Sequence, residues 1–268
     1  MIAFASNSLL CRLALTQTSI DPASFTFVRI FSGAVALWLI MKMHRDTREM
    51  EGSWSSAVAL FIYAAAFSFA YLDLSAGTGA LLLFGAVQAT MILWGFRKGE
   101  RLDAIQIVGF IVAVTGLVAL VFPGLTAPPL FSSILMIGAG VAWGIYSIRG
   151  KDARDAIAST AGNFLCAMPF AAALSIILFS RARLDHGGIF CAAVSGAITS
   201  GLGYVIWYSA LSGLKATSAA TVQLSVPVLA AAGGILLLGE PMTLRYVIAS
   251  IAVLGGIALV VIEKNRPE

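Results

Sequence analysis

The chain has 268 residues, of which 59% are hydrophobic and only 11% are charged, and it carries a formal net charge of +4. A soluble domain carries about 25% charged residues, so this composition and the mean hydropathy of +0.94 exclude an ordinary water-soluble fold. The basic residues lie in short loops and form no dense tract, so we expect no nucleic-acid partner.

Apolar runs follow one another along the whole chain. Runs of about 17–25 residues cross a bilayer core as helices. Lipid offers no hydrogen-bond partner to the backbone, and the runs lack the alternation of barrel strands. The sequence therefore predicts an all-α polytopic membrane protein embedded in a lipid bilayer. Its ten transmembrane helices are expected at residues 1–17, 22–42, 54–73, 76–96, 103–122, 130–150, 155–180, 187–212, 215–238 and 243–263.

Lysine and arginine are distributed unevenly between the two ends of these helices. Of the 17 basic residues, 12 lie on the side of the membrane where both termini are expected. Three lie on the opposite side, namely Arg181, Arg183 and Arg245. Arg12 and Arg29 fall inside spans. Because cytoplasmic loops are enriched in lysine and arginine, both termini are predicted to be cytoplasmic, with the protein in the inner (plasma) membrane.

The two halves of the chain share a pattern at an offset of 140 residues. Gly99-Glu100 corresponds to Gly239-Glu240, and Phe67 corresponds to Trp207. A unit with five helices ends on the side opposite to its start, so a tandem copy is inserted upside down. Inverted repeats of this kind build many secondary transporters, whose substrate sites lie near the midplane. A duplication that only built a stable bundle is the alternative.

The motif Gly99-Glu100-Arg101 and its counterpart Gly239-Glu240-Pro241 close the fourth helix of each half. Further characteristic positions are Asn7, Arg29, Gln106, Gly109, Gly116, Trp143, Tyr146, Pro227, Gly255 and Gly256. On these residues the chain resembles EamA-type members of the drug/metabolite transporter superfamily, which include the YddG-like amino-acid exporters. Val87 departs from the symmetry, since it stands where the second half has Pro227.

The resemblance implies two EamA repeats, residues 1–124 with the first five helices and residues 125–268 with the last five. It also implies a central cavity lined mainly by helices 1, 3, 4, 6, 8 and 9, and the export of amino acids and other metabolites.

Aromatic residues recur at helical spacing in three spans: Tyr63, Phe67 and Tyr71 in the third, Trp143 and Tyr146 in the sixth, and Tyr204, Trp207 and Tyr208 in the eighth. Such stripes suit a cavity for an amphipathic solute and can hold an ammonium group by cation–π attraction. Interface anchoring or packing is the alternative, which we favour for Tyr71 and Tyr208 near helix ends.

Several polar side chains lie inside spans, where each must find a partner. The amides Asn7, Gln88, Asn163 and Gln223 are expected either to bind a zwitterion or to hydrogen-bond between helices. Arg12 and Arg29 are expected to extend to the interface, to pair with Asp21 or Asp73, or to receive a substrate carboxylate.

The sequence lacks a phosphate-cradling GxxxxGK[ST] loop and the HExxH and GxSxG motifs. We therefore expect neither ATP nor an enzymatic activity, and no cofactor or metal. No span centre carries an acidic residue, which favours a facilitator or exchanger over a proton-coupled carrier.

The sequence predicts a secondary transporter that exports small metabolites by alternating access, above all amino acids, including aromatic and apolar ones. A multidrug or other metabolite exporter, a channel and a structural membrane protein are the alternatives. The predicted substrate-binding residues are Asn7, Arg29, Tyr63, Phe67, Gln88, Trp143, Tyr146, Tyr204, Trp207 and Gln223.

Overall fold

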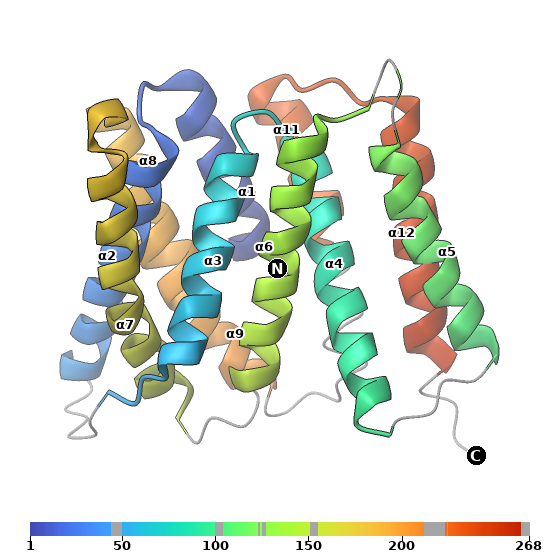
Figure 1. The fold of residues 1–268 in the computed structure, drawn as a ribbon, viewed down its shortest axis with the longest axis horizontal. Helices are drawn as coiled ribbons and strands as arrows, with labels where there is room; N and C mark the ends of the chain where they lie inside the picture. Colours follow the sequence, from blue (N-terminus) through green and yellow to red (C-terminus); the bar gives the residue numbers. More distant parts are fainter. Residues whose placement is uncertain are drawn as a thin grey trace.

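The computed structural model describes residues 1–43, 50–99, 104–122, 124, 127–150, 155–211, 223 and 225–263. These residues form helices joined by turns, with no strand among them (Figure 1). In chain order the elements are α1 (Ile2–Gln17), α2 (Pro22–Met43), α3 (Trp54–Ala70), α4 (Ala76–Arg97), α5 (Ala104–Val121), α6 (Leu130–Gly150), α7 (Ala156–Ile177), the 3-10 turn η1 (Phe179–Arg181), α8 (His186–Val194), the π-helix η2 (Ser195–Leu202), α9 (Gly203–Leu211), α11 (Ser225–Leu238) and α12 (Leu244–Glu263).

Six helices of the described residues have the length and apolar character that a bilayer requires. Within the described ranges, α2, α4, α5, α6, α7 and the continuous helix His186–Ala210 are long and apolar enough to cross a membrane. Trp54–Ala70, Ser225–Leu238 and Leu244–Val260 are shorter apolar helices. The structure thus confirms the predicted all-α polytopic membrane fold.

One predicted boundary differs from the observed one, and another falls outside the described residues. The third helix ends at Ala70 rather than at residue 73, because Leu72 and Asp73 donate their N–H groups only three residues back, to Phe69 and Ala70. The predicted span 215–238 falls partly outside the described residues, which begin there with Gln223 and then Ser225.

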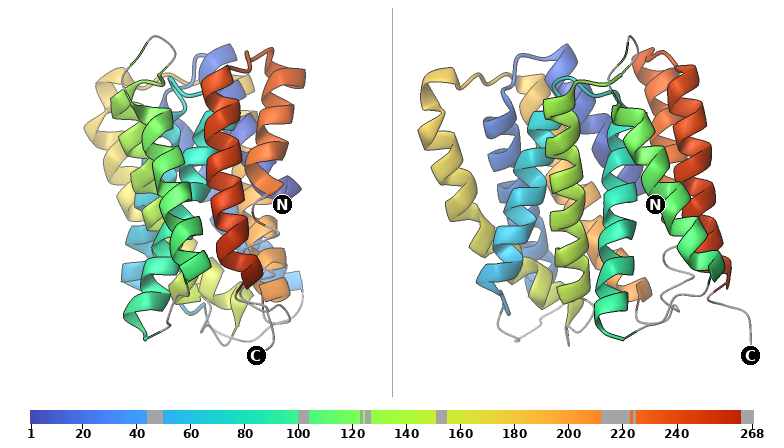
Figure 2. Two further views of the ribbon diagram at one scale, coloured as in Figure 1. Left: turned by 90° about the vertical axis from the view of Figure 1, so that its right-hand side faces the viewer. Right: turned by 45° about the vertical axis from the view of Figure 1, so that its right-hand side comes forward.

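The helices stand side by side and roughly parallel (Figures 1 and 2). The turns that follow α1, α3, α5, α7 and α11 gather at one end of the bundle, at the top of Figure 1, which we call the upper end. The first residue of α1 lies near half the height of the bundle, so this helix covers only its upper part (Figure 1). Side chains of α1 therefore reach the middle of the molecule.

Small residues allow close contacts between helices. A Cβ atom added to Gly140 would collide with the Leu83 carbonyl oxygen, so α6 lies directly against α4. A Cβ atom on Gly256 would collide with the Gly109 carbonyl oxygen, and α5 and α12 therefore pack backbone to backbone. Small residues at such contacts let the backbones of neighbouring membrane helices approach closely.

Candidate functional site

Aromatic side chains from both halves of the chain meet in the interior. The phenyl ring of Phe4 lies at their centre, with ring centroids 5.9 Å from each of Trp143, Tyr204 and Trp207 and 6.4 Å from Phe84. We call the following buried residues the aromatic cluster: Phe4, Tyr63, Phe67, Phe84, Trp143, Tyr146, Tyr204 and Trp207.

The indole of Trp143 connects the first half of the chain to the second. Its ring centroid lies 5.0 Å from Tyr63 on α3, 5.4 Å from Tyr146 on α6 and 4.6 Å from Tyr204 on α9. The structure thus brings together the aromatic residues that the stripes predicted.

Arg29 on α2 is buried beside this cluster, with only 2% of its surface exposed. Its Nε donates to Ser200 Oγ at 3.1 Å, and its Nη2 donates to the hydroxyls of Tyr63 at 2.9 Å and Tyr204 at 3.3 Å. The guanidinium carbon lies 5.0 Å from the ring centroids of both Tyr63 and Phe67. Nη1 is buried and has no hydrogen-bond partner among the residues that the structure describes.

Asn7 extends this polar network to α1. Its Nδ2 donates to the Tyr63 hydroxyl at 3.1 Å, and its Oδ1 accepts from Ser195 Oγ at 2.6 Å and Thr199 Oγ1 at 3.3 Å. The amide is therefore well satisfied, whereas the guanidinium is not.

The hydroxyl groups that complete the network lie on the π-helix η2. A Cβ atom on Gly196 would collide with the Arg29 carbonyl oxygen, so glycine lets η2 press against α2 at this level. The wider π-helical turn brings Ser195 and Thr199 to Asn7 and Ser200 to Arg29. Single π-helical turns inside α-helices are frequent at functional sites.

The remaining predicted amides hold helices together. Gln88 Nε2 on α4 donates to Gln223 Oε1 at 3.1 Å, and both side chains are buried. Asn163 donates to the Tyr146 hydroxyl at 3.5 Å and accepts from the backbone N–H of Ser53 at 2.9 Å. These bonds agree with the interpretation of buried amides as interhelical contacts.

Some members of the site were not predicted as binding residues. Phe4 and Phe84 lie in apolar runs and look like packing residues in the sequence. A short group of hydroxyl residues in the span 187–212 could have indicated these members of the site: Ser195, Thr199 and Ser200.

At the upper end, Arg12 joins three separate segments. Its Nε lies 3.1 Å from Glu240 Oε1, and its Nη1 donates to the carbonyl oxygens of Tyr71 at 2.9 Å and Leu72 at 2.8 Å. Glu240 Oε2 also accepts from the N–H of Ala76 at 2.8 Å. We call this arrangement the upper latch. The expected pairing of Arg12 with Asp21 or Asp73 was wrong, because Arg12 forms its ion pair with Glu240.

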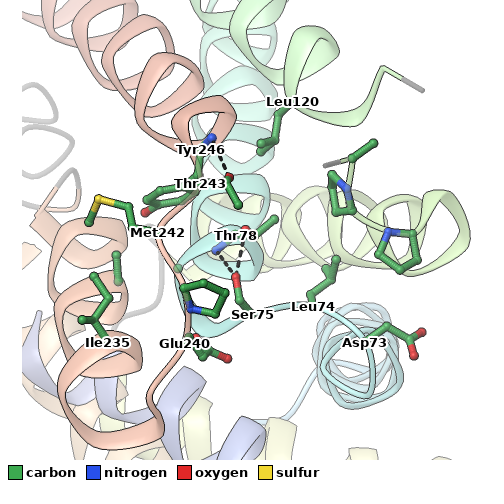
Figure 3. A pocket seen from close by; sticks show the side chains of 16 residues that line it. Asp73, Leu74, Ser75, Thr78, Leu120, Ile235, Glu240, Met242, Thr243 and Tyr246 are labelled. Atoms are coloured by element: carbon green, nitrogen blue, oxygen red, sulfur yellow. Dashed lines mark hydrogen bonds between the residues drawn. The ribbon is translucent and has the colours of Figure 1, made fainter. Parts of the chain in front are cut away.

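A cavity of about 200 Å³ lies beside Glu240 of the latch, at the upper ends of α4, α5, α11 and α12 (Figure 3). Ser75, Thr78, Thr243 and Tyr246 line it together with apolar side chains. None of the aromatic cluster residues is among its lining residues, so this cavity is separate from the predicted site.

Comparison with known proteins identifies the family. The EamA-like transporter family matches residues 130–262. An uncharacterized protein of Pseudomonas aeruginosa is 54% identical over 261 residues, which cover 97% of this chain and 91% of the relative. A protein of Escherichia coli K12 named "probable amino-acid metabolite efflux pump" is 25% identical over 197 residues, 68% of this chain and 66% of the relative.

A crystal structure with 18% sequence identity superposes with a TM-score of 0.66 and covers 99% of this chain and 98% of its own. At this identity the likeness concerns the fold. The relatives and the family match point to a carrier of small molecules rather than an enzyme. The chain therefore belongs to the EamA-like transporter family of the drug/metabolite transporter superfamily, as a multi-pass membrane transporter of a small molecule.

Proposed function

We propose that this protein is a secondary transporter that exports amino acids, including apolar and aromatic ones, and related metabolites by alternating access. The observation that carries the proposal is the buried aromatic cluster around Arg29, to which α1 to α4 contribute from one half and α6, η2 and α9 from the other. A site between two halves is exposed to either side when the halves tilt against each other. The name of the Escherichia coli relative also supports amino acids as the substrate class.

We also propose that residues 1–124 and 125–268 form two inverted repeats. The contacts between helices support this division. If each helix of a contacting pair is replaced by its counterpart in the other half, the result is again a pair of helices in contact. The pair α3–α6 becomes α8–α1, and α4–α6 becomes α11–α1. Both halves also use a left-handed glycine after the fourth helix, Gly99 with φ of 91° and Gly239 with φ of 65°.

The upper latch supports the idea of a gate. It ties α1 to the turn between α3 and α4 and to the segment after α11. In this conformation the aromatic cluster is buried and its own rings fill the centre. Substrate exchange at the upper end would require these segments to separate.

We further propose that the upper end faces the outside of the cell and that both termini are cytoplasmic. Several of the basic residues behind this orientation, among them Arg48, Arg101 and Lys151, lie outside the described residues. Cysteine at the exposed positions Leu184 or Met242 should react with an impermeant maleimide on intact cells, whereas cysteine at Met43 should not. A variant without the three native cysteines is the background, and the reverse labelling pattern would contradict the orientation.

Counterflow in proteoliposomes tests the transport proposal. Vesicles loaded with unlabelled phenylalanine should accumulate labelled phenylalanine transiently and saturably. Trp143→Ala and Tyr204→Ala should each reduce the flux about tenfold, since a contact worth about 1.4 kcal/mol changes an affinity by that factor. Trp54→Ala, on a side chain that is 62% exposed, is the control. If both cluster variants keep wild-type flux, the rings serve only packing.

A further inference from the structure

We infer that the group recognised on the substrate is a carboxylate, that Arg29 receives it, and that the preferred substrates are organic monoanions with an apolar or aromatic body. The inference rests on the proposed function and specifies the substrate class of the same site. It differs from that proposal because it makes the α-amino group of an amino acid dispensable.

The charge of Arg29 points to an anionic group on the substrate. Arginine stays protonated in proteins, and Arg29 is buried in the membrane-spanning part of the bundle. No carboxylate among the described residues lies within 4.0 Å of its guanidinium nitrogens, and the ion pair observed in these ranges joins Arg12 to Glu240. A buried cation without an anionic partner is costly. A substrate anion would supply that partner.

The geometry around the Arg29 guanidinium also fits a carboxylate. Nε and Nη2 are held by three hydroxyl groups, and the guanidinium lies against the rings of Tyr63 and Phe67. These contacts fix the guanidinium and leave Nη1 as a buried donor that no described residue pairs with. A fixed donor of this kind is suited to a carboxylate oxygen.

The polar groups around Arg29 favour an anion as well. The hydroxyl oxygens of Tyr63 and Tyr204 accept from Arg29, which turns their hydrogens away from the guanidinium. The carbonyl oxygen of Asn7, in contrast, already accepts two hydrogen bonds, from Ser195 and Thr199. The site is therefore rich in donors and poor in acceptors, which favours an anion over an ammonium group.

Uncharged and cationic analogues of the substrate would lack this attraction to Arg29. An amine or a carboxylate ester with the same aromatic body would bring no negative charge to Arg29. The positive guanidinium also repels a second cation placed nearby. A purely structural Arg29, which only joins α2 to α3 and α9, would produce no such preference among ligands.

The test is a competition panel on the wild-type protein in proteoliposomes. Counterflow of labelled phenylalanine and of labelled 3-phenylpropionate is measured against unlabelled phenylalanine, 3-phenylpropionate, phenethylamine and phenylalanine methyl ester. We expect 3-phenylpropionate to inhibit at least as strongly as phenylalanine, and the amine and the ester to inhibit at least about tenfold more weakly. Equal inhibition by the amine or the ester overturns the inference but leaves the proposed transport intact. If neither labelled probe shows counterflow, the proposed function fails as well.

Variants then assign the preference to Arg29. Arg29→Gln should reduce inhibition by 3-phenylpropionate about tenfold or more, whereas Arg29→Lys should retain part of the preference for the acid. Arg245→Gln removes an arginine that bonds the backbone carbonyl of Phe122 at the upper end, and it should leave the ranking of inhibitors unchanged. An unchanged ranking in a folded Arg29→Gln protein, verified by its thermal unfolding, would contradict the assignment. The wild-type panel remains decisive if this variant does not fold.

Discussion

Two aspartates show how single residues hold the upper turns together. Asp21 accepts from the N–H groups of Ala23 and Ser24 at the start of α2, and also from the N–H of Arg183 at 2.9 Å. Asp185 accepts from the N–H groups at the start of α8, and also from the N–H of Ser19 at 3.2 Å. Asp21 thus caps α2 and bonds the turn before α8, and Asp185 caps α8 and bonds the turn before α2.

This arrangement predicts an acid-sensitive contribution of Asp21 to stability. Burial alone would raise the pKa of Asp21, but hydrogen bonds from Ser24, Arg183 and Ala23 lower it below its ordinary value. Because the pKa is lower in the folded state, the contribution is fully present above the unfolded pKa of about 3.9 and is lost as the pH falls through the folded pKa.

Asp21→Ala should therefore reduce the free energy of unfolding by about 1 kcal/mol at pH 7, the usual effect of removing a helix cap. The difference from wild type should shrink as the pH is lowered below 3.9. Thermal unfolding in detergent micelles across this pH range measures both effects. A difference that does not change with pH would show that the charge of Asp21 contributes nothing.

At the scale of the helices, adjacent glycines provide a test of packing between α5 and α12. A Cβ atom on Gly256 would collide with the Gly109 carbonyl oxygen, whereas one on Gly255 would meet nothing within 4 Å. Gly256→Ala should lower the free energy of unfolding by about 1–3 kcal/mol through overpacking, and Gly255→Ala should leave it nearly unchanged. Melting temperatures of the purified variants compare the two. Equal shifts would mean that α12 moves freely relative to α5.

The upper latch makes a second prediction at this scale. Ser8 is buried one helical turn below Arg12 on α1, so a cysteine at this position reports access from the upper end. Glu240→Gln removes the ion pair, which is partly exposed and contributes about 1 kcal/mol at most. Labelling of Ser8→Cys by an impermeant maleimide on cells should then become about fivefold faster. An unchanged labelling rate would show that the latch does not control access.

The lengths and order of the helices were predictable, because lipid forces each apolar run to satisfy its own backbone hydrogen bonds. The gathering of Tyr63, Trp143 and Tyr204 also followed from stripes at helical spacing. The partner of Arg12 could not be predicted from the sequence, since Glu240 lies 228 residues away and only folding brings the two together. The π-helix η2 could not be predicted either, because its close approach to α2 depends on tertiary contacts of Gly196.

At the scale of the whole molecule, the positions of the acidic residues bear on energy coupling. Asp73 lies in the turn after α3 and accepts a hydrogen bond from Ser132 at the start of α6, so it stays at the upper end. Among the described residues, none of the acidic side chains belongs to the aromatic cluster or to its polar network. A carrier without a carboxylate at its centre lacks the group that commonly relays protons in pumps and transporters.

We therefore expect a facilitator or exchanger that does not couple transport to protons. In proteoliposomes, a pH gradient without a substrate gradient should produce no accumulation, and Asp73→Asn should retain wild-type counterflow. Accumulation that a protonophore abolishes would contradict this prediction.

The unpaired charge of Arg29 also has an electrical consequence. If the substrate is a monoanion, the empty site is positive and the loaded site is neutral. A potential of 100 mV acts on one elementary charge with about 2.3 kcal/mol, so an inside-negative potential would hold the empty transporter open toward the cytoplasm. It would leave the neutral, loaded form indifferent to voltage. Efflux would then be electrogenic, and a potassium–valinomycin diffusion potential, negative inside, should accelerate the release of 3-phenylpropionate from vesicles in which the transporter is oriented as in the cell.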